Sequence, residues 1–113
     1  HFAALHAKFE EFYGQLGATV DDMAERIVQL GGTPSGTTQA VGRTTRLAPY
    51  PADLRDGMAH VAALAERYAA LADTTRNAID IASEAGDANT ADLLTGTSRM
   101  LDKALWMLEA HLG

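Results

Sequence analysis

One histidine and three carboxylates near the start of the chain are spaced to share one face of a helix. At about 100° per residue, these side chains fall within an arc of about 100°: His6, Glu10, Asp21 and Glu25. They form two pairs of residues four apart, and such neighbours lie close enough to hold one ion between them. Imidazole and carboxylate ligands without a thiolate suit iron or manganese, with zinc also possible. The spacing therefore indicates a candidate metal site.

The two pairs, His6 with Glu10 and Asp21 with Glu25, cannot meet within one helix. Glu10 and Asp21 are separated by about 16 Å along the axis. They can meet across a two-fold axis, where two copies of the helix cross antiparallel midway between the pairs. His6 then faces the partner's Glu25. Glu10 then faces the partner's Asp21.

Two glycines, Gly14 and Gly17, lie at this crossing on the same face and would let the two backbones approach closely. A two-fold interface is self-complementary, so it would form two equivalent sites. The alternative from the residues alone is that the acidic face is solvated and forms ion pairs in a plain helical oligomer. Both interpretations stay open at this point.

The helix that must position these residues runs from about Phe2 to Leu30. Its apolar residues recur three or four apart: Leu5, Phe9, Phe12, Leu16, Val20, Met23, Ile27 and Leu30. Gly31-Gly32 and Pro34 end it. The apolar stripe is centred about 130° from the polar face, so we expect it in the core.

Two more long helices are predicted. A linker rich in Thr, Gly and Ser follows from Ser35 to Leu47, with one short helical turn around Gln39–Val41. The second long helix opens at Pro49–Pro51 and ends at Gly86, with a stripe at helical spacing of Leu54, Met58, Val61, Leu64, Tyr68, Leu71, Thr75 and Ile79. The third begins within Asp87–Thr90, where several residues are good N-caps, and has a regular apolar stripe of Leu94, Ser98, Leu101, Leu105, Leu108 and Leu112.

The composition is that of a single globular domain, residues 1–113, and the fold class is all-α because no segment alternates with a period of two. The absence of cysteine excludes disulfide and thiolate sites and is compatible with a reducing cytoplasm. The net charge of -6 disfavours direct contact with nucleic acid and favours attraction of cations. No run of apolar residues is long enough for a membrane span.

Three long amphipathic helices make an incomplete bundle, since four is the common closed arrangement. The chain opens at His1-Phe2 without a methionine, already in a helical pattern. We therefore expect a fourth helix before His1, or a partner chain that covers the open face.

The motifs His6-Ala-Lys-Phe-Glu10 and Asp21-Asp-Met-Ala-Glu-Arg-Ile-Val-Gln-Leu-Gly-Gly32 resemble the central helix of the Dps mini-ferritins (DNA-binding protein from starved cells), with its pattern LHxxFD, DxxAER and LGG. The resemblance continues through Gly36-Thr-Thr-Gln, Tyr50-Pro, Gly86-Asp87, Thr90-Ala-Asp92 and Leu101-Asp-Lys-Ala-Leu-Trp106-Met-Leu-Glu-Ala, so it covers essentially the whole chain.

The resemblance implies a ferritin-like four-helix subunit that assembles into a hollow homododecamer. Such a cage oxidises Fe(II), preferentially with hydrogen peroxide, stores the ferric mineral and protects DNA from oxidative damage. It also implies that His6, Glu10, Asp21 and Glu25 are the iron ligands of centres shared between two-fold-related subunits. Glu10 departs from the family's usual Asp by one methylene. The family's further ligand histidine, in an HWN motif, would lie before His1.

Further residues match the family or sit beside its motifs. Asp87 and Asp92 match the acids that line its three-fold iron-entry pores, while the residues alone favour an N-cap for Asp87 and a first-turn acid for Asp92. Arg26 is predicted to be a structural ion-pair partner. The remaining side chains match no ligand pattern: Trp106 and Met107 are predicted to pack, with Trp106 alternatively an oxidisable neighbour, and His60 and His111 are predicted at the surface.

Two alternatives to iron oxidation remain. One is a non-catalytic cage or DNA-associated scaffold with a defective or Zn/Mn-tuned metal site; the other is the plain helical oligomer. DNA binding has no support from the acidic chain, and no nucleic-acid-binding residue is assigned.

Overall fold

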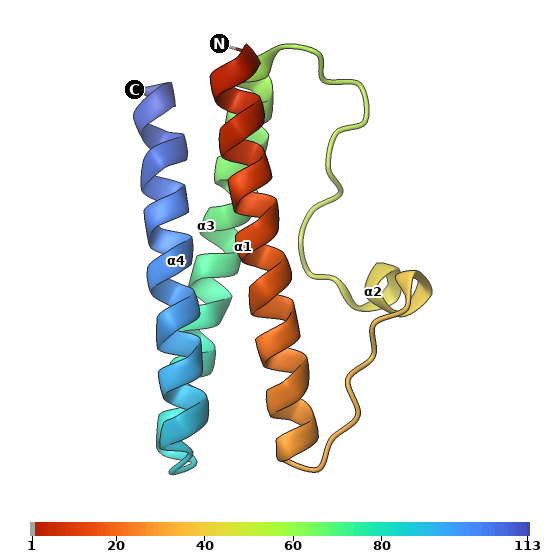
Figure 1. Cartoon of the computed structure of the whole chain (residues 1–113), viewed down its shortest axis with the longest axis vertical. Helices are drawn as coiled ribbons and strands as arrows, with labels where there is room; N and C mark the ends of the chain where they lie inside the picture. The colour runs from red at the N-terminus through yellow and green to blue at the C-terminus, as the bar shows by residue number, and fades with distance from the viewer. Residues whose placement is uncertain (1) are drawn as a thin grey trace.

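The computed structural model describes residues 2–113 and is built from helices alone over that range. The helices are α1 (Phe2–Gln29), α2 (Thr38–Thr44), α3 (Gly57–Glu84) and α4 (Ala88–Leu112). Figure 1 shows α1, α3 and α4 side by side. The helices α1 and α3 run in the same direction, and α4 runs antiparallel to both. The all-α prediction is confirmed. Among the described residues, no helix combines the length and apolar character needed to cross a membrane.

The α3–α4 hairpin packs more closely than any other pair of helices. Small side chains at the interface allow this approach: Ala65, Ala72, Ser98 and Ala104 are all buried. Gly86 makes the turn between the helices with a φ of 76°, a left-handed conformation that disfavours a side chain. Asp87 then caps α4, accepting a hydrogen bond from the Thr90 backbone N–H at 3.1 Å. The predicted cap is confirmed, and so is the stripe except at its last member, because Leu112 is 48% exposed.

The core lies between all three long helices. Its buried members are Leu5, Phe12, Val61, Ala65, Tyr68, Ala72, Leu101, Ala104 and Leu108. The Phe12 and Tyr68 rings join α1 to α3 with their centroids 5.7 Å apart. At the start of α3, a side chain in place of Gly57 would meet Leu5 Cδ1 at 2.9 Å, so glycine leaves room for the Leu5 side chain.

The crossover from α1 to α3 runs the length of the bundle and includes α2. The predicted short turn around Gln39–Val41 is confirmed as part of α2, which Thr37 caps through a 3.1 Å hydrogen bond from the Ala40 N–H. The predicted start of the second long helix at Pro49–Pro51 is wrong, because α3 begins at Gly57.

Tertiary contacts explain the late start of α3. The Arg67 guanidinium donates to the backbone carbonyls of Ala48 and Pro49, and the His60 ring bonds the Leu54 carbonyl at 3.0 Å. The Tyr50 ring stacks on His60 and lies beneath the Arg67 cation. These bonds hold the segment extended and engage carbonyls that a helix would need.

The apolar stripe of α1 is only partly covered. Leu5 and Phe12 are buried, and Phe9 and Leu16 pack against the core. The periodicity predicts Val20, Ile27 and Leu30 in the core, but they are exposed, as is Met58 of α3. Within this chain, α4 covers a narrower strip of α1 than the periodicity predicts.

Candidate metal centre

The four predicted ligands lie where the helical spacing predicts, on a single exposed face of α1. His6, Glu10, Asp21 and Glu25 are all exposed. The buried residues of the same helix, Leu5 and Phe12, point to the core. The polar face is therefore free of the packing that holds the subunit together, and its side chains can reach a ligand or a second chain.

Each pair stays separate within one chain. Glu10 and Asp21 are separated by about 16 Å of helix, and α1 is continuous between them. Over residues 2–113 the structure contains no group of three His, Asp or Glu side chains that could hold a metal ion. A single subunit thus presents two pairs of candidate ligands, and each pair is smaller than the three or four protein ligands that metal centres use.

The middle of this face is open. A Cβ built on Gly14 or on Gly17 would meet no atom within 4 Å. Tyr13 and Val20 flank the same stretch and are 80% and 67% exposed. Large apolar side chains beside a bare backbone are typical of a surface that another protein covers. Near the first pair, the His6 ring stacks on the Phe2 ring with centroids 5.7 Å apart.

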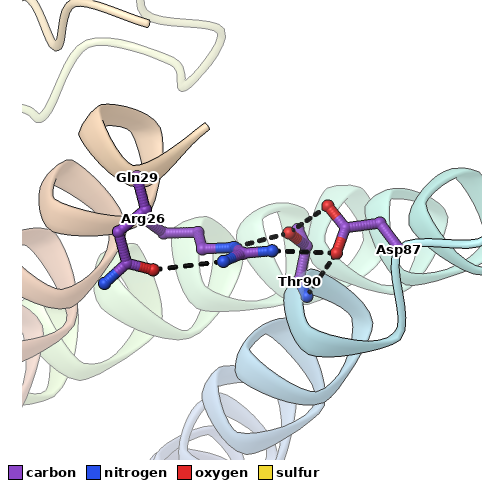
Figure 2. A network of polar contacts seen from close by, with 4 residues as sticks. All are labelled: Arg26, Gln29, Asp87 and Thr90. Carbon is purple, nitrogen blue, oxygen red and sulfur yellow. Dashed lines mark hydrogen bonds and ion pairs between the residues drawn. The ribbon is translucent and has the colours of Figure 1, made fainter. Parts of the chain in front are cut away.

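Behind the second pair, a polar network joins the end of α1 to the start of α4 (Figure 2). The Arg26 guanidinium donates to Asp87 Oδ1 at 2.9 Å, to Thr90 Oγ1 at 2.9 Å and to Gln29 Oε1 at 3.1 Å. The Arg26 and Asp87 side chains are 20% and 30% exposed. The prediction that Arg26 is a structural ion-pair partner is confirmed, and its partner is Asp87.

Asp87 is therefore occupied by structural bonds. Hydrogen bonds from the Thr90 hydroxyl and backbone N–H, followed by the Arg26 guanidinium, lower the pKa of the Asp87 carboxyl below its ordinary value. Asp92 lies just beyond the first turn of α4, so its prediction as a first-turn acid is wrong. Its exposed carboxylate lies with Asp22 along a groove of about 330 Å³ between α1 and α4. The pore assignment of both acids stays a prediction, because it concerns an assembly of several chains.

The four residues that matched no ligand pattern differ in how far the structure agrees with their predicted positions. Trp106 is 64% exposed on α4, so its prediction as a packing residue is wrong, whereas Met107 does pack against the core. His60 is half-buried and bonded through both ring nitrogens, to the Tyr50 hydroxyl at 2.7 Å and to Leu54, so it is not a free surface residue. His111 is exposed, as predicted.

Sequence reasoning gave Tyr68 no role beyond the apolar stripe. Its ring is buried in the core and its hydroxyl is buried without a hydrogen-bond partner among residues 2–113. Burial raises the pKa of this phenol. Its position in the stripe gave a signal for burial, but nothing in a linear pattern indicates an unpaired hydroxyl.

Comparison with known proteins supplies the family. The model of the ferritin-like domain matches residues 1–113. The DNA protection during starvation protein of Agrobacterium fabrum is 50% identical over 111 residues, covering 98% of this chain and 68% of that protein.

Solved structures agree with this match. The Dps of Staphylococcus aureus has a TM-score of 0.93 at 33% identity, over 99% of this chain and 74% of that one. The Dps of Vibrio cholerae, described as a member of the ferritin-like diiron-carboxylate proteins, has a TM-score of 0.93 at 32% identity, over 99% and 70% of the two chains. The chain therefore has the ferritin-like fold and belongs to the Dps family of mini-ferritins.

Proposed function

We propose that this protein oxidises Fe(II) at centres shared between two-fold-related subunits, and stores the ferric product within a closed homo-oligomer, most simply a dodecamer. The observation that supports this most directly is the pair of half-sites on α1. Each half-site has two ligands on an exposed face, and the bare backbone of Gly14 and Gly17 lies midway between them. A two-fold axis through that point completes both half-sites at once.

The chain's own residues supply placement and charge. His6 offers an imidazole nitrogen, and Glu10 with the partner's Asp21 and the partner's Glu25 offers hard oxygen ligands that stabilise Fe(III) more than Fe(II). Two Fe(II) ions each lose one electron to hydrogen peroxide, which takes up two protons and leaves as two waters. Because both electrons are consumed together, no hydroxyl radical is released. This is the chemical basis for protecting DNA, the role named for the Agrobacterium relative.

Iron is the substrate and cargo in this proposal. The net charge of -6 per chain favours its approach, and Asp92 is the acid at the α4 start that no bond within the described chain occupies. Glu10 keeps the carboxylate of the family motif but extends it by one methylene, which favours a second candidate function, a cage with weakened or altered metal binding. Addition of Fe(II) and hydrogen peroxide separates the two, since only the oxidising and storing cage keeps the ferric product in solution as rust-coloured protein.

A complementation experiment tests the shared site. One variant combines His6→Ala with Glu10→Ala, and the other combines Asp21→Asn with Glu25→Gln. Each homo-oligomer is expected to be nearly inactive, because every site lacks one half. In a mixed dimer one site is doubly damaged and the other is intact. Random reassembly of the two variants should thus restore about one quarter of the wild-type rate.

The assay measures the initial rate of Fe(II) oxidation by peroxide, with light scattering to confirm that each variant assembles. Lys8→Ala with Glu11→Ala is the matched control, since this exposed ion pair lies on α1 beside the first half-site. The control should retain the wild-type rate. Mixed oligomers as inactive as their parents would show that each site is built within one chain. A monomer in solution would end the proposal.

A further inference from the structure

The second half of α1 has no buried apolar anchor. Among the described residues of this helix, only Leu5 and Phe12 are buried. Glu25 lies about 20 Å further along the helix than Phe12. Around it, Met23 and Ala24 are half-buried, and Val28 is exposed. Side-chain packing therefore fixes the position of the first half-site more firmly than that of the second.

The Arg26 network replaces the missing apolar anchor. Its three hydrogen bonds come from one planar guanidinium, whose rigid fork fixes direction as well as distance. On the other side, Asp87 is itself immobilised, because Thr90 donates to it through both its backbone N–H and its hydroxyl. The anchor thus connects the last turn of α1 to the first turn of α4, which the close α3–α4 packing holds in place.

Glu25 moves with this anchor. It directly precedes Arg26, and both line a groove of about 340 Å³ together with Asp22, Gln29, Asn89 and Leu93. A rotation or slide of the α1 end that breaks the Arg26 bonds displaces the Glu25 carboxylate by a comparable amount. Misplacement of a reacting group by about 1 Å can cost about a hundredfold in rate.

We propose that Arg26 is a positioning residue for Glu25, acting through its bonds to Asp87 and Thr90. The assignment rests on the proposed function. Arg26 is not one of the proposed ligands: its side chain turns from α1 toward α4 (Figure 2). Asp87 serves as the fixed end of this anchor, which leaves Asp92 as the free acid at the start of α4.

The test uses Co(II) as a spectroscopic probe ion, because it does not turn over, and Fe(II) oxidation as a second measurement. Arg26→Met removes all three bonds of the guanidinium. Thr90→Val removes the hydroxyl, and with it both the bond from Arg26 Nε and the bond to Asp87. Arg26→Lys keeps the charge beside Asp87 without the fork. Arg76→Met is the matched control, because Arg76 pairs with Asp73 and Asp102 and so joins α3 to α4. None of these three residues lies on α1, the helix that carries Glu25. All titrations are made on the assembled oligomer well below its melting temperature.

Arg26→Met is expected to weaken Co(II) binding about tenfold, as loss of a supporting contact to a ligand commonly does, and to alter the visible Co(II) spectrum. Thr90→Val should change the Co(II) affinity and the spectrum in the same direction, but by less. Arg26→Lys should give values between those of Arg26→Met and the wild type. Arg76→Met should change neither the affinity nor the spectrum. The Fe(II) concentration for half-maximal rate should rise more than the maximal rate falls. In a Glu25→Gln background, Arg26→Met should add nothing, because its effect passes through Glu25.

The outcomes that overturn the proposal are separate from those that overturn the shared metal site. If Glu25→Gln weakens Co(II) binding but Arg26→Met and Thr90→Val do not, Arg26 has no positioning role. A lower melting temperature in Arg26→Met with an unchanged spectrum would likewise show that Arg26 only stabilises the fold. If Glu25→Gln itself leaves Co(II) binding unchanged, the proposed function fails.

Discussion

The two halves of α1 present chemically similar pairs of candidate ligands but are held by different forces. Near His6 and Glu10, Leu5 and Phe12 are buried at 9% and 4% exposure. Near Asp21 and Glu25, the polar network of Arg26 joins α1 to α4. The proposed two-fold site would combine one half of each kind, so each centre would depend on both forces.

This difference has a physical consequence for each half. Burial of apolar side chains involves no charge that salt could screen or protons could neutralise, whereas a partly exposed ion pair responds to both. The apolar half provides most of the stability, because burying one large side chain is worth more than one partly exposed pair. The polar half orients the end of α1, because the hydrogen bonds of a planar guanidinium are directional and hydrophobic contacts are not.

The largest effect is expected in the apolar half. Phe12→Ala should lower the free energy of unfolding by about 3–5 kcal/mol, because it removes a ring buried against Tyr68 and leaves a cavity. Urea denaturation followed by circular dichroism measures this. Phe2→Ala is the control on the same helix, since that ring is 82% exposed and its loss should cost little. Equal costs for the two variants would refute the contrast between buried and exposed anchors.

An intermediate effect is expected in the polar half, and it depends on pH. The pKa of Asp87 is lowered in the folded state from its ordinary value of 3.8, so its charge stabilises the fold above that value. This stabilisation is lost as the pH falls through the folded-state pKa. Asp87→Asn keeps an N-cap but removes the charge, so it should melt a few degrees below wild type at pH 6.

The gap between wild type and Asp87→Asn should close below pH 4. Thermal melts from pH 6 to pH 3 measure it, with Phe12→Ala as the control whose deficit should stay constant across the series. A gap that persists unchanged at pH 3 would mean that the charge of Asp87 contributes nothing to the anchor.

The smallest effect is expected from the Tyr68 hydroxyl. Tyr68→Phe keeps the ring that packs on Phe12 and removes an unpaired buried polar group, so the change should be within about 0.5 kcal/mol or slightly stabilising. Urea denaturation measures it beside Phe12→Ala. A loss of more than about 1 kcal/mol would show that the hydroxyl has a partner in the assembled protein.

Local sequence pattern predicts the helices themselves better than the tertiary contacts that surround them. The glycine stop predicts the end of α1 and the N-cap predicts the start of α4, because both signals depend on nearby residues. The predicted start of α3 is wrong because Arg67 and His60 fix the true start through contacts with the preceding segment. Val20 and Trp106 are predicted to pack because periodicity identifies an apolar position without showing whether a neighbour covers it.

The candidate site divides in the same way. The four ligand positions on α1 follow from helical spacing, because every member lies on one element. The role of Arg26 was predicted, but its partner Asp87 lies far along the chain and on another helix, which no local pattern can reveal.

The long crossover between α1 and α3 has a consequence for the order of folding. The α3–α4 hairpin closes through the short turn at Gly86, so its contacts are local and cost little chain entropy. Because α1 and α3 run in the same direction, α1 can dock only after the whole crossover has been looped back. We expect the hairpin to form first and α1 to join last, so the helix with the candidate ligands should be the one of the three long helices whose amides exchange with solvent most readily.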